Sequence, residues 1–201
     1  MQYQEQKFNI SKLNGISEKQ IAAHIGLYAG YVKHTNLIRE KIREFENTDK
    51  EKNAYAIAEL RRRFSFEFNG MRMHEYYFEQ LEGGAKEINP NSELVKIVSE
   101  KYGSFENFIE HFKTVGKSRG IGWAVFYYDI KGGVPHIVWI SVHELGVLAG
   151  LPCILAMDMW EHSFMVDYLP NEKEKYIDAF LNNINWSVAE KRFKSARTIS
   201  T

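Results

Sequence analysis

The chain of 201 residues has one cysteine, Cys153, and therefore cannot form an internal disulfide. Disulfides persist in oxidising compartments, so this composition favours a reducing one. The N-terminal residues 1–7 have no apolar h-region of the kind found in signal peptides, and no run of about 18 apolar residues occurs anywhere. We therefore expect a soluble, cytoplasmic protein that does not engage a membrane.

Net charge is also absent, because 26 Lys and Arg residues balance 26 Asp and Glu residues. This balance gives no argument for a nucleic acid or an anionic membrane as a partner. The local basic run Arg61-Arg62-Arg63 is interpreted as the solvated face of a helix. What is abundant is apolar: 44% of the residues are hydrophobic and 14% aromatic, which indicates a globular chain with a substantial core.

The first part of the chain shows helical periodicity. Apolar residues recur every three or four positions over residues 17–45 and again over residues 53–81. Ser17 followed by Gln20 resembles a capping box at the start of the first helix. We predict a long helical hairpin domain over residues 1–88, with an apolar side that another part of the protein must cover.

The second part begins after Asn89-Pro90-Asn91, the best candidate for a domain boundary. Its aromatic and β-branched runs predict a small antiparallel sheet of three strands, and shorter periodic segments predict flanking helices. The predicted strands cover residues 123–129, 136–142 and 151–159, and the predicted helices cover residues 92–101, 104–117, 161–168, 172–184 and 186–192. We therefore predict an α+β fold: the N-terminal helical hairpin, then an α/β domain over residues 89–201.

The segment Asp158-Met159-Trp160-Glu161-His162 carries a carboxylate and an imidazole four residues apart. Both groups bind transition metals, and a short turn after a strand can direct them to one point. His24 and His74 lie on the apolar stripes of the two long predicted helices, where a single histidine is more often a hydrogen-bonded core residue than a ligand. Together the four residues predict a metal site, because a buried aspartate is costly unless it is paired or metal-bound. Three histidines and one aspartate suit iron or manganese, and zinc remains possible.

These residues belong to a wider pattern, which resembles the iron/manganese superoxide dismutases over nearly the whole chain after the first dozen residues. The matching motifs are Gly122-Trp123-Ala124, Asp158-Met159-Trp160-Glu161-His162, Asp167-Tyr168, Asn183-Ile184-Asn185-Trp186, Ile16-Ser17 followed by His24, and Phe68-Asn69-Gly70 followed by His74. The resemblance implies that His24, His74, Asp158 and His162 bind one iron or manganese ion per subunit. It also implies the disproportionation of superoxide into oxygen and hydrogen peroxide.

The resemblance further assigns residues around the metal. His143 falls where the family has a Gln or His that bonds to metal-bound solvent; the alternative is a surface loop residue. Trp123 and Trp160 would wall the pocket, or serve only in core packing. Glu161 would reach His162 of the partner subunit in a homodimer or higher homo-oligomer, although the helix dipole alone could explain an exposed Glu there.

The chain departs from the family pattern on its first helix. The family has His-x3-His-x3-Tyr, whereas here Tyr28 replaces the second His and Tyr31 lies seven residues after His24. Seven residues are close to two helical turns, so we expect Tyr31 to face the metal. Tyr28 and Tyr31, with His143, are the candidate catalytic residues. Two alternatives stay open: a dismutase-fold protein with a binding role and no dismutase activity, and another non-haem metal enzyme on the same scaffold.

Overall fold

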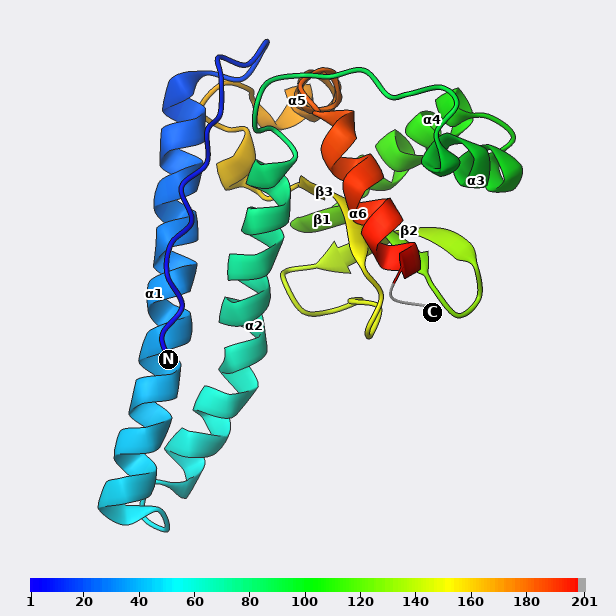
Figure 1. Cartoon of the computed structure of the whole chain (residues 1–201). Coiled ribbons are helices and arrows are strands. Elements are labelled where there is room, and N and C mark those ends of the chain that lie inside the picture. Colours follow the sequence, from blue (N-terminus) through cyan, green and yellow to red (C-terminus); the bar gives the residue numbers. More distant parts are fainter. Residues whose placement is uncertain (199–201) are drawn as a thin grey trace.

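The computed structural model describes residues 1–198. Its first half is a pair of long helices, α1 (Glu18–Asp49) and α2 (Ala54–Glu79), which pack side by side in antiparallel fashion (Figure 1). The side chain of Ser17 caps α1 by accepting the backbone N–H of Gln20. The long helical hairpin expected from the sequence is confirmed.

The N-terminal segment runs along this hairpin before α1 begins (Figure 1). The ring of Phe8 packs against the rings of Tyr28 and Phe78, at centroid distances of 5.5 and 5.1 Å. Closer to the terminus, the backbone N–H of Tyr3 donates to the side chain of Asn36. The first residues of the chain therefore cover one side of the two long helices.

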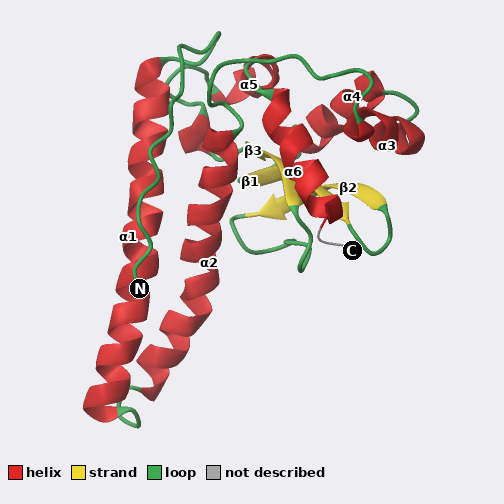
Figure 2. Cartoon of the chain, in the orientation of Figure 1, coloured by secondary structure: helices red, strands yellow, loops and turns green. Residues whose placement is uncertain are grey.

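The second half combines helices with one sheet (Figure 2). Its elements are α3 (Glu93–Tyr102), α4 (Phe105–Gly116), β1 (Gly122–Asp129), β2 (Val134–Ser141), β3 (Cys153–Asp158), two 3-10 turns, η1 (Glu161–Ser163) and η2 (Pro170–Glu172), and finally α5 (Lys173–Asn182) and α6 (Trp186–Thr198). The three strands are antiparallel in the order β2-β1-β3. The predicted α+β fold with a three-stranded sheet is confirmed.

The central strand β1 is buried along all but its last residue. In the antiparallel pairing of β1 with β3, Trp123 lies directly opposite Asp158. The strand β3 in turn packs against α2. This register brings the end of the sheet against the helical hairpin, and it places an aromatic wall beside a carboxylate.

The predicted helix over residues 161–168 is wrong. The chain there forms only the 3-10 turn η1, followed by irregular turns. Two side chains explain the difference, because they bind backbone groups that a helix would need. Gln20 donates to the carbonyl of His162 and accepts the N–H of Val166, while the Ser163 hydroxyl donates to the carbonyl of Trp160.

Other boundaries differ less. The third strand is shorter than predicted, since Leu151 and Pro152 precede it, and the last helix continues six residues further than predicted, to Thr198. The capping box is only half formed, because Gln20 uses its side chain elsewhere. The segment at Pro90 lies between α2 and α3.

Within residues 1–198, no helix combines the length and apolar character needed to cross a membrane.

Candidate metal centre

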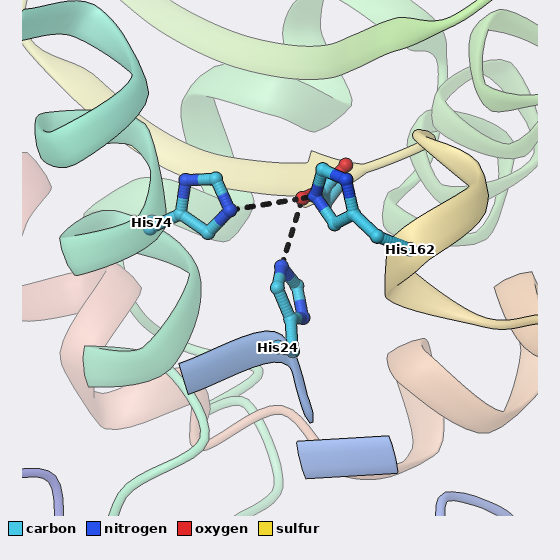
Figure 3. Close-up of side chains that lie close together, drawn as sticks. His24, His74 and His162 are labelled. Atoms are coloured by element: carbon cyan, nitrogen blue, oxygen red, sulfur yellow. Dashed lines mark hydrogen bonds and ion pairs between the residues drawn. The ribbon is translucent and has the colours of Figure 1, made fainter. Parts of the chain in front are cut away.

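Four potential ligands converge where the hairpin meets the sheet. His24 comes from α1, His74 from α2, Asp158 from the last position of β3, and His162 from η1 (Figure 3). One ligand atom from each of the four lies within 4.8 Å of all the others. Three of the side chains are fully buried, and that of His162 keeps 18% of its surface exposed.

The three imidazoles point their Nε2 atoms at one oxygen, Oδ2 of Asp158. The distances are 2.9 Å for His24, 3.0 Å for His162 and 3.6 Å for His74. The second carboxylate oxygen, Oδ1, accepts the backbone N–H of Trp160 at 2.8 Å, which fixes the orientation of the carboxylate. The cluster therefore presents three nitrogen donors and one oxygen donor to a common point.

The hydrogen bonds of His74 define its tautomer. Its Nδ1 lies 2.6 Å from the carbonyl oxygen of Gly70, and a carbonyl can only accept, so Nδ1 carries the proton. The lone pair of Nε2 then points into the cluster, where this buried atom has no hydrogen-bond partner among residues 1–198. A metal ion would satisfy that nitrogen, and the carbonyl is the usual orienting partner of a metal-bound histidine. The donor set, with no sulfur, fits iron or manganese.

Electrostatics favour the protonation states that bind metal. Burial holds the pKa of His74 well below its usual value, and the neighbouring His24 lowers it further. Burial also lowers the pKa of His24, against the opposing effect of Asp158. For Asp158, burial acts to raise the pKa, but the interactions with His162 and His24, each within hydrogen-bond distance of Oδ2, outweigh it and keep the pKa below its ordinary range. Neutral imidazoles around a carboxylate are what a divalent or trivalent ion requires.

Beside the ligands, His143 is fully buried and links two other predicted residues. The indole Nε1–H of Trp123 donates to Nδ1 of His143 at 2.9 Å, and Nε2 of His143 lies 2.7 Å from the Tyr31 hydroxyl. Burial lowers the pKa of His143 to about 4 and raises that of Tyr31. The surface-loop alternative for His143 is thus excluded. The ring of Tyr31 lies 5.0 Å from that of His74, as the seven-residue spacing predicts.

Of the remaining predicted site residues, Trp160 lies in the pocket, whereas Tyr28 and Glu161 lie outside it. Trp160 stacks on both His143 and His162, with centroid distances of 4.8 and 5.6 Å, and so forms a wall of the pocket. Tyr28 does not join the pocket: its buried hydroxyl accepts the N–H of Gln6 and donates to Glu75. Glu161 is exposed to solvent next to His162.

Sequence reasoning missed three positions that shape the site. Gln20 clamps the loop that carries His162 through its two bonds to that loop. Gly70 leaves space for Tyr31, since a Cβ there would lie 2.6 Å from a Tyr31 ring carbon. Phe66 packs its ring 4.7 Å from the His143 ring, edge to face. The glycine inside a predicted helix was the only visible signal, because such a residue often has a packing reason.

The fold and this donor set define a protein with a mononuclear metal site of three histidines and one aspartate. Residues 90–192 match the family model described as iron/manganese superoxide dismutases, C-terminal domain. Among curated relatives, the superoxide dismutase [Fe] of Saccharolobus solfataricus is 32% identical over 189 residues, covering 91% of this chain and 88% of that protein.

Two further relatives agree with this match. The superoxide dismutase [Fe] of Aquifex pyrophilus is 35% identical, covering 92% of this chain and 87% of its own length, and that of Cupriavidus metallidurans is 33% identical with 92% of both chains covered. The chain belongs to the iron/manganese superoxide dismutase family.

Proposed function

We propose that this protein is a superoxide dismutase, which converts two superoxide ions into oxygen and hydrogen peroxide at one metal ion. The observation that carries the proposal is the convergence of three imidazole Nε2 atoms on Oδ2 of Asp158, next to the hydrogen-bonded pair His143 and Tyr31. The bound ion would supply one-electron chemistry, accepting an electron from one superoxide and returning one to the next. The protein residues hold the ion and manage protons.

The ligands His24, His74, Asp158 and His162 would hold the ion. Each has one atom directed at the common point, and the carboxylate offsets part of the cation's charge in a buried site. The carbonyl of Gly70 orients His74, and the backbone N–H of Trp160 orients Asp158. These outer contacts limit rotation of the ligands and so favour one coordination geometry.

His143 and Tyr31 would manage protons near the ion. Because an indole nitrogen only donates, Nδ1 of His143 accepts from Trp123 and its proton lies on Nε2. That Nε2–H donates to the Tyr31 oxygen, which leaves the Tyr31 hydroxyl hydrogen free to be donated within the pocket. Peroxide needs two protons to leave as hydrogen peroxide, and a hydroxyl held beside the ligands is placed to deliver one.

We propose iron as the resident ion, with manganese as the alternative. The support is the name that the curated relatives carry, superoxide dismutase [Fe]. The donor set itself accepts either metal.

We also propose a homodimer in which Glu161 contacts His162 of the partner subunit. Glu161 is exposed, His162 retains partial exposure, and the apolar residues Met165, Val166 and Leu169 are exposed close by in the same segment. We further propose that the chain has two domains, residues 1–88 and 89–201. We also propose a cytoplasmic location. The single Cys153 is buried and unpaired, which is compatible with a reducing compartment.

Two measurements test the function: metal per chain by elemental analysis, then superoxide consumption after loading with iron or manganese. We expect about one ion per chain and superoxide turnover. His74→Gln should abolish both, whereas the matched control His111→Gln, at an exposed position on α4, should change neither. Binding of no metal after reconstitution with both ions would overturn the metal site.

A loaded protein without turnover would instead favour one of the two alternatives, a binding role or a different non-haem metal enzyme.

A further inference from the structure

The buried ligand cluster has one side with solvent access. His24, His74, Asp158 and His143 are fully buried. The pocket residues that keep partial exposure are Tyr31, Phe66, Trp160 and His162, and we call these four the pocket mouth. A small anion that approaches the metal must pass among them.

Phe66 connects the pocket mouth to the basic run on α2. Its ring lies 4.7 Å from the His143 ring, 6.2 Å from that of Tyr31 and 6.5 Å from that of Trp160. On the outer side, the guanidinium carbon of Arg63 lies 3.7 Å from the Phe66 ring centroid, a cation–π contact. Arg63 is thereby held against the mouth.

The other two arginines of the run face elsewhere. Arg61 pairs with Glu46 of α1 at 2.7 Å, and Arg62 forms two bonds to Glu59 of its own helix. Both side chains are at least 60% exposed. The prediction that this run is a solvated helix face is therefore correct for Arg61 and Arg62. Arg63 differs, because its guanidinium packs on the Phe66 ring.

Arg63 is paired with an anion that lies deeper. Its Nε and Nη2 contact Oε1 of Glu67 at 2.9 and 2.8 Å, and the Glu67 side chain is only 10% exposed, against 46% for Arg63. Glu144 is a second anion at the rim, where it accepts the Ser65 hydroxyl. An approaching anion thus meets the guanidinium first, with the carboxylate of Glu67 behind it.

Arg63 and Glu67 are close enough to act on the pocket itself. The Phe66 ring that the Arg63 guanidinium covers at 3.7 Å lies 4.7 Å from the His143 ring, and Glu67 is bonded to the same guanidinium at 2.8 Å. The positive charge of Arg63 stabilises a negative charge in the pocket, whereas the negative charge of Glu67 destabilises it.

We propose that Arg63 is the cation that superoxide meets at the pocket mouth, and that the Arg63–Glu67 pair sets the attraction of this site for small anions. The inference rests on the proposed function for the identity of the substrate, but not for the charge arrangement. Removing Arg63 leaves an uncompensated carboxylate that repels anions. Removing the charge of Glu67 leaves a free guanidinium that attracts them.

Azide binding to the ferric form tests this without using turnover. Against wild type, Arg63→Gln should weaken azide binding by roughly three- to tenfold, Glu67→Gln should strengthen it by a similar factor, and the double variant should return close to wild type. Arg63→Lys keeps the charge and should largely restore affinity. Arg61→Gln, on the same helix, is the matched control and should have no effect.

The differences should shrink in about 0.5 M salt, because exposed charges are screened there. The proposal is overturned if Arg63→Gln and Arg61→Gln behave alike, or if Glu67→Gln weakens azide binding.

Superoxide consumption at low and high ionic strength separates this inference from the function. The azide pattern in a protein without turnover would remove the dismutase proposal and leave Arg63 as an anion-attracting residue. Turnover with no azide response in either variant would keep the dismutase and reject the role of Arg63.

Discussion

The indole nitrogen of Trp123 donates a 2.9 Å hydrogen bond to Nδ1 of His143, and this contact fixes which nitrogen of His143 carries the proton. The two residues come from the central strand and from the loop after β2, so the bond ties the sheet to the loop. With the proton on Nε2, His143 donates toward Tyr31. The tautomer of one buried histidine therefore sets the direction of the hydrogen bond to Tyr31 beside the ligand cluster.

Replacing Trp123 by Phe keeps a large aromatic ring but removes the indole N–H that donates to Nδ1 of His143. We expect the metal content to stay near one ion per chain and superoxide turnover to fall on the order of tenfold, because His143 can then change tautomer. An unsatisfied buried nitrogen should also cost about 1–3 kcal/mol in the free energy of unfolding. Turnover, metal analysis and denaturant titration measure these effects, with Trp139→Phe on β2 as the control. Unchanged turnover would contradict the role of the tautomer.

The fold and the convergence of the four candidate ligands were predictable because they depend on local patterns. Helical periodicity fixes which residues of α1 and α2 face the core, so His24 and His74 had to lie on the apolar side. Tyr31 follows from the same geometry, being about two turns beyond His24. Asp158 and His162 were found because their spacing matches the change from strand to turn.

The rest of the site depends on contacts between distant segments. Tyr28 was expected at the pocket, but its hydroxyl is taken by Gln6 of the N-terminal segment and by Glu75. The loop after Asp158 has a helical pattern, yet the side chain of Gln20 intercepts its backbone groups. A single sequence carries no signal for such pairings, since neither partner's local neighbourhood identifies the other.

Acid should destabilise the metal-free protein in a defined range. Burial lowers the pKa of His143 from its ordinary value of 6.5 to about 4, so the folded state binds fewer protons than the unfolded state between these values. Its contribution is therefore fully present above about pH 6.5 and is lost as the pH falls toward 4. The loss is on the order of 3 kcal/mol for this residue.

The free energy of unfolding of the metal-free chain, measured from pH 7 to 4, tests this prediction. His143→Gln should flatten the curve, while His111→Gln at an exposed position should leave the curve as in wild type. The same slope in His143→Gln and wild type would show that His143 does not contribute.

Gln20 should be required for the position of His162. Its Nε2 donates to the His162 carbonyl at 2.6 Å, and its Oε1 accepts the Val166 N–H at 2.9 Å. Gln20→Ala leaves two backbone groups without partners, so we expect a loss of about 2–4 kcal/mol in the free energy of unfolding and weaker metal retention. Thermal unfolding and competition with a chelator measure both, and Lys19→Ala, exposed on the same turn, is the control. Metal retention equal to wild type would show that the clamp does not hold His162.

Val142, directly before His143, is the only non-glycine residue among residues 1–198 with a positive φ, at 51°. This backbone region is unfavourable for a β-branched side chain and costs of order 1–3 kcal/mol. The surrounding contacts hold it there: its N–H donates to the Ile121 carbonyl, and its own carbonyl accepts the indole N–H of Trp160. Val142→Asn should raise the free energy of unfolding by about 1 kcal/mol, because asparagine tolerates this conformation better, and should leave metal content unchanged.

The matched control is Val147→Asn, which changes the same residue type in the same loop at a position without positive φ. If strain at Val142 is real, only Val142→Asn stabilises the protein in thermal or denaturant unfolding. Equal effects of the two substitutions would mean that the loop adopts its path without strain. In that case His143 would be held in the pocket by its bonds to Trp123 and Tyr31 and by packing against Phe66 and Trp160, and a looser loop would be expected to lower turnover only when one of those contacts is also removed.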